Sequence, residues 1–485
     1  MLNTIALVVL GSCIVLAVST NAAFAAEGLL PASVTAKDFS SVSTRAAAVA
    51  PALFEGESPE SEQYNFLQQQ IYSGETESAA NQLETVVAQI EAGYNRYHED
   101  LVIPLALLGD SLLLQQKYDA ALDMYDRAQH IARVSYGLFD TRQLAVVYRE
   151  ADAYRKLGDL ESSSRREEYA FEVMNRNFDA NDPKLLPGLQ RLGDFYLATY
   201  NYLSARSLYQ RALRIHTQNN TNDSLEAIRT LQGIARTHRL ERFPPVYVAN
   251  PEDNRLQGPI PGLTTSDLDG QHVGFNNFPA GEAALKQIVS IRQQQEPEDV
   301  AATMEAFIEL ADWFLMFGHT NEANTLYAHV YENMLANQQD AAVFFAKPKL
   351  IYLPKPHDPR PPTATGQVQR VEGRVTLGFN VATSGRVRKL TTLESIPPKL
   401  MDFRVRRSVR QAVFRPSLLE GVPVAADSQT YTYAFDYFPE LEPISEQSSV
   451  PASAPTNTTV DEGGPGNVPS AKTIEATPSE ETAEI

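Results

Sequence analysis

The stretch Leu105–Ala128, LALLGDSLLLQQKYDAALDMYDRA, returns further along the chain as Leu189–Ala212, LQRLGDFYLATYNYLSARSLYQRA. The two copies carry large apolar, small and aromatic residues at matching positions. A weaker copy lies halfway between them, with Val147, Ala151, Tyr154, Leu160 and Ala170, which gives a repeat period of about 42 residues. A fixed period of this length is typical of a solenoid, in which each unit buries its apolar face against its neighbours.

The pattern within each copy resembles the tetratricopeptide repeat. A first helix carries a large apolar residue, Leu, a small residue and an aromatic, and a second helix carries Ala, Tyr and Ala. Gly109 and Gly193 in the first helix, with Ala121 and Ala205 in the second, predict close helix crossings at these points. The resemblance covers roughly half the chain and implies an all-α solenoid with a concave groove. Because the family's usual period is ~34 residues, we expect longer helices or longer connections here.

Further copies extend the array in both directions. A divergent first copy contains Phe66, Leu67, Ala79 and Leu83, and a last copy contains Phe307, Leu310, Ala311, Phe314, Ala323 and Tyr327. The fifth copy begins with Leu231, Ile234 and Ala235, but Pro244-Pro245 then excludes a helix interior. We therefore predict repeats over 59–240 and 282–345, with a loop insertion over 241–281 between the two helices of the fifth repeat.

The N-terminal segment has the features of a secretory signal. An apolar run from Ile5 to Val18 precedes the small-residue site Ala23-Phe24-Ala25, which predicts a signal peptide over 1–25 and a flexible leader over 26–58. The run has no Lys or Arg before it, so an uncleaved inner-membrane anchor stays an alternative. Cys13, the only cysteine, lies in a lipoprotein-like Leu-Gly-Ser-Cys sequence, and cleavage after Ala25 would leave the mature protein without any cysteine.

The region after the repeats changes in character. Six prolines between Lys347 and Pro362 predict a semi-rigid linker over 346–365. The next segment, 366–438, alternates apolar and polar residues as strands do, first around Val375 and Phe379 and last around Tyr431–Tyr437, with a helical pattern between them. The expected fold class is α+β and multidomain: the all-α solenoid followed by a small ββαβ domain. Residues 439–485 predict a disordered acidic tail.

The 366–438 segment resembles the C-terminal domain of the TonB energy-transducer family. The resemblance rests on Glu372-Gly373-Arg374-Val375, on Ala412-Val413-Phe414-Arg415-Pro416 and on the later Gly421-Val422-Pro423-Val424. It implies a small sheet backed by a helix, which binds peptide segments of outer-membrane transporters by strand addition at a sheet edge. The candidate edge is the last strand, with Tyr431, Thr432 and Tyr433 as partner-binding residues. Alternatively, these aromatic residues only pack on the helix.

A second candidate surface is a series of aspartates in the repeats. The residue after the small position of the first helix is Asp in four copies, Asp110, Asp152, Asp194 and Asp312, and Arg236 interrupts the series in the fifth. In tetratricopeptide arrays this position tends to face the groove, so the series predicts a preference for a basic peptide. The alternative is that a solvated helix face tolerates these residues without any ligand.

A third candidate surface is basic. Residues 366–437 carry eleven Lys or Arg and six Asp or Glu, a net +5 in a chain of net −19. Arg404 and Arg407 lie on the predicted exposed side of the helix, together with Arg406 and Arg410. This face could meet the acidic tail, the repeat groove or anionic lipid head groups, or it is simply a solvated helix face.

The composition and motifs argue against catalysis and nucleic-acid binding. The strongly acidic charge lacks the basic footprint that nucleic acid requires. The eight histidines are scattered, and no metal-binding, phosphate-binding or nucleophile motif occurs. We predict no enzyme, no metal and no cofactor, although an enzyme hidden in the insertion around Asp253, Asp267 and Asp269 is a third, unsupported alternative.

The sequence favours a periplasmic protein-interaction scaffold, exported by its signal peptide. In this interpretation the groove and the TonB-like domain bind peptide segments of bacterial envelope proteins, and outer-membrane transporters are among the expected partners. The alternative function is a membrane-anchored TonB-type component of energy-dependent transport across the outer membrane.

Overall fold

The computed structural model describes residues 59–245, 277–295, 297, 299–359 and 370–439. The predicted signal segment, the leader, most of the insertion and nearly all of the acidic tail lie outside these residues. Those predictions therefore stay untested.

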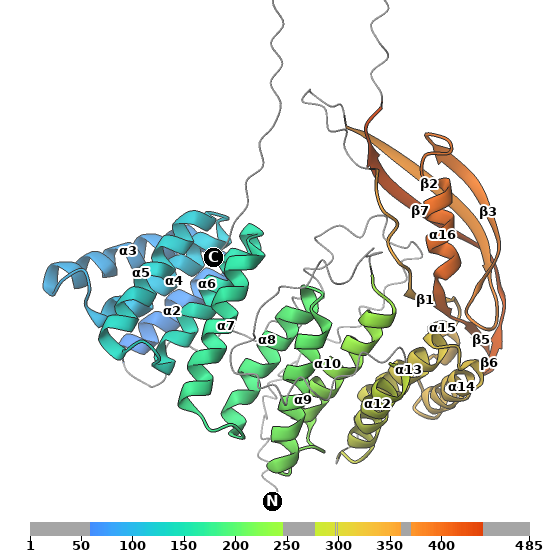
Figure 1. The fold of residues 1–485 in the computed structure, drawn as a ribbon, viewed down its shortest axis with the longest axis horizontal. Coiled ribbons are helices and arrows are strands. Elements are labelled where there is room, and N and C mark those ends of the chain that lie inside the picture. Colours follow the sequence, from blue (N-terminus) through green and yellow to red (C-terminus); the bar gives the residue numbers. More distant parts are fainter. Residues whose placement is uncertain (1–58, 246–276, 296, 298, 360–369, 440–485) are drawn as a thin grey trace, which may run out of the picture. The chain divides into compact units, whose positions relative to one another are not determined.

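The first part of the described chain is a series of antiparallel helix pairs (Figure 1). The pairs are α2 (Pro59–Ser73) with α3 (Thr76–Gly93), α4 (Val102–Leu114) with α5 (Tyr118–Tyr136), α6 (Leu144–Leu157) with α7 (Leu160–Asn177), α8 (Leu186–Ala198) with α9 (Tyr202–Gln218), α10 (Leu225–Arg242) with α12 (Phe278–Gln293), and α13 (Val300–Met316) with α14 (Thr320–Ala336). This arrangement confirms the predicted helical-repeat fold.

Capping side chains set the start of the first helix in successive pairs. Asp140, Asp182 and Ser224 stand one repeat period apart, and each side chain accepts a hydrogen bond from a backbone N–H two or three residues later. Such caps satisfy N–H groups that have no partner within the helix. Short 3₁₀ turns, such as Thr141–Gln143 and Pro183–Leu185, lie between the cap and the helix. These additional turns contribute to a period longer than ~34 residues.

The turn between the two helices of a pair also recurs with the period of the repeats. Gly74, Gln116, Gly158 and Tyr200 all adopt positive φ, at 99°, 62°, 91° and 64°. Glycine reaches this region without a steric penalty, whereas Gln and Tyr do so at a cost. The turn geometry is thus kept even where the glycine is absent.

The predicted close crossings are confirmed at the glycines. A Cβ atom placed on Gly109 would lie 2.5 Å from the Tyr125 ring, and one on Gly193 would lie 2.7 Å from the Tyr209 ring. Gly233 of the next pair approaches the same Tyr209 ring equally closely. Each tyrosine is fully buried, so a large aromatic fills the space that the small residues leave.

The fifth pair is built from segments on either side of the insertion. α10 and α12 pack against each other, and His238 Nδ1 lies 3.1 Å from Asn277 Oδ1 at the start of α12. Gly281 of α12 lies directly against the buried Trp313 of α13. The second helix of this pair starts at Phe278, slightly before the predicted boundary at 282.

The C-terminal module is a small sheet with one helix on one face (Figure 1). Strands β2 (Val371–Val381), β3 (Val387–Ile396) and β7 (Ala426–Tyr437) form an antiparallel sheet in the order β3-β2-β7, and β5 (Ser417–Leu419) pairs with β6 (Val422–Val424). Helix α16 (Asp402–Gln411) buries Val405 and Val409 against Leu377, Tyr433 and other core residues of the sheet. The predicted ββαβ order is confirmed, with α16 beginning at Asp402.

The predicted proline-rich linker is in part a structural element of this module. Lys349–Tyr352 form strand β1, which pairs antiparallel with β4 (Val413–Arg415). Pro354 and Pro356 are buried, and their carbonyl oxygens accept hydrogen bonds from Ser408 and Tyr433. The linker interpretation is therefore wrong for 349–356. Proline has no backbone N–H to donate, but its carbonyl oxygen still accepts a hydrogen bond, so prolines fit these positions.

Candidate functional site

The free edge of the sheet in the C-terminal module is strand β7. It pairs with β2 from Val371↔Tyr437 to Val381↔Ala426, and β2 is its only neighbour in the sheet as described. No backbone hydrogen bond joins the outer edge of β7 to another segment within the described ranges. An unpaired row of N–H and C=O groups on a 12-residue strand is a template for a further strand.

The three residues predicted on this edge differ in their surroundings. Tyr433 is only 3% exposed, and its hydroxyl donates to Asp358 Oδ1 at 2.5 Å, so its side chain belongs to the core. Tyr431 packs partly on the same core, where burial raises the pKa of its hydroxyl to about 12. Thr432 is exposed, with its Oγ1 3.0 Å from that of Thr376 on β2. Of the three side chains, only Thr432 lies open on the sheet surface.

The opposite edge of the sheet, strand β3, is partly covered. Arg406 of α16 donates to the Leu390 carbonyl oxygen at 3.3 Å and to Thr392 Oγ1 at 3.2 Å. Each edge strand contains one residue with a positive φ, Lys389 at 49° on β3 and Ser428 at 57° on β7, so only the Arg406 contacts distinguish the two edges. Of the two edges, β7 is therefore the one better prepared for strand addition.

The repeat aspartates, in contrast, are engaged within the protein. Asp110 is 6% exposed and accepts hydrogen bonds from the Tyr125 hydroxyl at 2.8 Å and from Arg149 Nε at 2.9 Å. Tyr125 belongs to the same helix pair, and Arg149 belongs to the next one. Burial raises the pKa of Asp110, and Arg149 opposes this shift.

The third pair uses two carboxylates and one arginine. Arg191 of α8 bonds Glu167 through Nε and Nη2, at 2.8–3.0 Å, and bonds Asp152 Oδ1 through Nη2 at 2.9 Å. Glu167 follows Asp152 at the same spacing as Tyr125 follows Asp110. Arg155 gives Asp152 a second ion pair at 2.6 Å.

The remaining two aspartates follow the same scheme. Asp194 accepts from the Tyr209 hydroxyl at 2.7 Å and from Arg229 Nη2 of the next pair at 2.6 Å. Asp312 accepts from the Tyr327 hydroxyl at 2.6 Å. Its arginine is Arg415 of the C-terminal module, which bonds both carboxylate oxygens, at 3.1 and 2.8 Å.

These contacts change the interpretation of the aspartate series. We expected Asp110, Asp152, Asp194 and Asp312 to present open negative charge to a basic peptide. Each carboxylate instead has an arginine partner, because the following unit places a guanidinium next to it. The series therefore joins successive units and does not form an uncompensated acidic groove. Arg149 and Arg191, three residues before Asp152 and Asp194, were a signal for this in the sequence.

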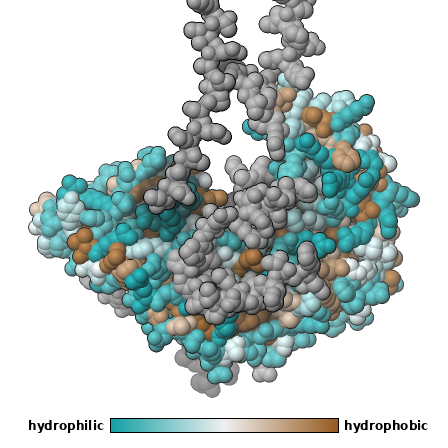
Figure 2. Space-filling view, in the orientation of Figure 1, coloured by the Kyte–Doolittle hydropathy of each residue, from teal (hydrophilic) through white to brown (hydrophobic). Residues whose placement is uncertain are grey.

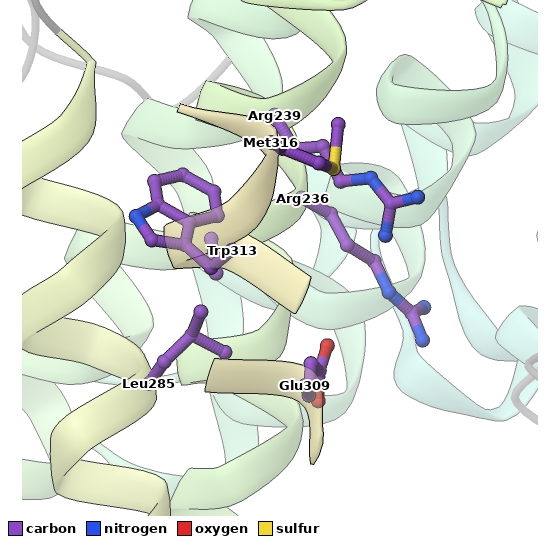
Figure 3. A pocket seen from close by; sticks show the side chains of 7 residues that line it. Arg236, Arg239, Leu285, Glu309, Trp313 and Met316 are labelled. Carbon is purple, nitrogen blue, oxygen red and sulfur yellow. The ribbon is translucent and has the colours of Figure 1, made fainter. Parts of the chain in front are cut away.

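The junction between the fifth and the sixth unit carries the reversed charges. Arg236 stands at the aspartate position, and Glu309 stands three residues before Asp312, where Arg149 and Arg191 stand in other units. Burial raises the pKa of Glu309, and Arg236 and Arg239 oppose this shift. A cavity of about 20 Å³ lies between α10, α12 and α13 at this place, with Arg236, Arg239 and Glu309 on one side and Trp313 and Leu285 on the other (Figure 3). This volume holds about one water molecule, so the cavity is too small for an organic ligand.

The basic helix of the module is only partly available. Arg404 and Arg407 are exposed, as predicted from the sequence, but Arg404 Nη1 donates to the His357 carbonyl oxygen at 3.1 Å. Phe403 beside them is 74% exposed. The face shown in Figure 2 has small hydrophobic patches separated by hydrophilic residues, without a broad apolar groove among the coloured residues.

The described part of the chain has neither a metal-binding cluster nor a membrane-spanning helix. No group of three or more His, Cys, Asp or Glu residues there is placed to hold a metal ion. Among the helices described, none combines the length and the apolar character needed to cross a membrane.

Comparisons with known proteins agree with the module but leave the partner open. Residues 366–436 match the family model for the Gram-negative bacterial TonB protein C-terminal. A search of the curated proteins found no match. The chain thus combines an array of repeated helix pairs with a C-terminal domain that matches the TonB C-terminal family model.

Several solved structures are similar to part of this chain at low sequence identity. BtubC (BKLC) from P. vanneervenii is 14% identical, with a TM-score of 0.37, and the similarity covers 62% of this chain and 99% of that chain. The nearly identical TPR-like repeats of a candidate kinesin light chain from Podosopora anserina are 16% identical, with a TM-score of 0.35, and cover 39% of this chain and 89% of that chain.

Proposed function

We propose that this chain is a non-catalytic interaction scaffold whose β7 edge binds an extended segment of another protein as a fourth strand. The observation that carries the proposal is the unpaired outer edge of a 12-residue strand in a TonB C-terminal-type domain. Backbone hydrogen bonds would supply most of the affinity, and the exposed Thr432 would contact alternate side chains of the bound segment.

The geometry of the repeats supports a structural role for the aspartates in this scaffold. Since Asp110, Asp152 and Asp194 are already paired with arginines of following units, a basic ligand would have to displace an internal guanidinium. Recognition by the array would therefore use its helix faces and loops. The β7 edge, in contrast, needs no internal bond to break before it binds.

The proposed place of action is the bacterial envelope, with envelope proteins as partners. Two features support this proposal: the signal-like segment over residues 1–25 and the Gram-negative origin of the family that the module matches. Sequencing the N-terminus of protein isolated from cells tests the export step, with Ala26 as the expected first residue. A start at Met1 in a membrane fraction would favour the anchored alternative.

A photo-crosslinking experiment tests the binding edge. A crosslinking amino acid replaces Thr432 on β7 in one variant and Thr391 on β3 in a matched control, both being exposed threonines on edge strands. After incubation with envelope extract, we expect the Thr432 variant to capture a defined segment of an envelope protein, mapped by mass spectrometry. A synthetic peptide of that segment should compete. Equal capture at Thr391, or no capture at Thr432, contradicts the proposal.

A further inference from the structure

The end of the repeat array is covered by the C-terminal module. Val413 and Leu418 of the module belong to the same buried core as Tyr327, Val330 and other residues of the last helix pair. The Leu418 N–H donates to the carbonyl oxygen of the buried Phe345 at 3.0 Å, and Arg386 donates to the Met316 carbonyl oxygen at 3.4 Å. Both the apolar and the backbone groups at the end of the array thus have partners in the module.

The charge contact at this junction copies the contacts between repeats. Asp110 receives a tyrosine hydroxyl from its own unit and a guanidinium from the next one. Asp312 likewise receives the Tyr327 hydroxyl from its own unit and the Arg415 guanidinium from the module. Arg415 therefore stands where the arginine of a seventh repeat would stand.

Arg415 also depends on this contact. It is 5% exposed, and its charge is balanced by Asp312, whose side chain is 17% exposed. A buried guanidinium without a carboxylate is strongly unfavourable, since its hydration is lost without compensation. Once the module lies on the last helix pair, Arg415 therefore requires Asp312 as its charge partner.

We propose that the C-terminal module is the terminal cap of the repeat array, with the last helix pair of the same chain as its fixed partner. Repeat arrays need such a cap, because the last unit would otherwise expose the apolar face that its neighbour should cover. Strand β1 strengthens the attachment, since it follows the last repeat directly and pairs with β4, which carries Arg415. The role goes beyond peptide binding: it makes the array and the module one cooperative body, in which β7 has a fixed orientation.

Amide hydrogen exchange of the full chain tests the cap. In Arg415→Met we expect amides of α13 and α14 to exchange at least about 100-fold faster, because removal of one partner from a buried pair opens the junction. The matched control is Arg404→Met, an exposed arginine of the same module, which should leave α13 and α14 unchanged. The amides of β2 should stay protected, since the module has its own core.

A second variant covers the case in which Arg415→Met does not fold. Asp312→Asn keeps the shape of the side chain and the Tyr327 contact but removes the charge, so we expect a smaller acceleration in the same helices. The exchanged pair Asp312→Arg with Arg415→Asp should recover part of the protection that either single change loses. Unchanged exchange of α13 and α14 in both Arg415→Met and Asp312→Asn would overturn the proposal.

Discussion

The buried cluster of Arg191, Glu167 and Asp152 gives the sharpest test of how the repeats are joined. The substitution Arg191→Met keeps most of the apolar stem of the side chain and removes its guanidinium. Glu167 is 1% exposed and Arg191 is 7% exposed, so the change leaves a buried carboxylate without its main partner. Asp152 keeps Arg155, and it is less affected.

The expected loss follows from the burial of the pair. Breaking a buried ion pair by removing one partner typically costs about 3–5 kcal/mol. The double variant Arg191→Met with Glu167→Leu removes both charges, and we expect it to lie within about 1 kcal/mol of the unmodified protein. Arg165→Met, which breaks the exposed ion pair with Glu161, should cost less than about 1 kcal/mol.

The assay is urea unfolding followed by far-UV circular dichroism, with amide exchange of α6–α9 to locate the loss. Local exchange matters because arrays of repeats need not unfold in two states. A cost below about 1 kcal/mol for Arg191→Met would show that the buried Glu167 does not depend on Arg191. So would a double variant that is as unstable as the single one.

Three further predictions follow from local geometry. Gly109→Ala should destabilise by about 1–3 kcal/mol in urea unfolding, because its Cβ would overlap the Tyr125 ring; Gly93→Ala, where nothing lies within 4 Å, should cost nothing or stabilise slightly. Gln116→Gly should raise the free energy of unfolding by about 0.5–1 kcal/mol, since φ is 62° there. The neighbouring Gln115, with a φ of −77°, is the control, and a lower free energy of unfolding in both Gln116→Gly and Gln115→Gly would contradict this. Burial raises the pKa of Glu150 to about 7, above its usual 4.5, so the folded state binds more protons and this group's stability contribution falls as the pH rises from 4.5 to about 7. Glu150→Gln should flatten that part of the pH profile of the unfolding midpoint, and an unchanged profile would exclude the shift.

Much of the array could be predicted from the sequence, because its geometry recurs in the residues. Gly109 and Gly193 marked the helix crossings, and Pro244-Pro245 marked the break in the fifth unit. The turn positions were less visible, since Gln116 and Tyr200 adopt the same backbone as Gly74 and Gly158 only under tertiary constraint.

The ion pairs of the charged residues could not be predicted from the sequence pattern of a single helix. The aspartate series suggested a groove because its partners lie 35–39 residues further along the chain, or 103 residues further in the case of Arg415. Arg149 and Arg191 were available as a periodic signal. Arg415 was not, because it belongs to a module of another fold and reaches Asp312 only through tertiary packing.

Strand β1 escaped prediction for a different reason. Lys349–Tyr352 is short and is surrounded by prolines, which favour an extended linker when read locally. Pairing with β4 is a long-range contact that the local pattern does not encode. The pairing also fixes the first strand of the module to the end of the array.

The proposed attachment of the module to the last helix pair bears on the two functions considered. A component that transmits motion through a flexible span needs its terminal domain free to move. Here Arg415, Leu418 and β1 hold the domain on the last helix pair. This arrangement supports the proposed scaffold, in which the position of β7 relative to the repeats is constant.

Amide hydrogen exchange of β7 with and without a bound segment tests strand addition at this edge most directly. The ligand is the synthetic peptide identified by crosslinking at Thr432, added at saturating concentration to the full chain. We expect slower exchange in Ala426–Tyr437, by at least about tenfold, with unchanged exchange in α4, α6 and α8. Unchanged exchange in β7, with protection of the aspartate-bearing helices α4, α6 and α8, would contradict it.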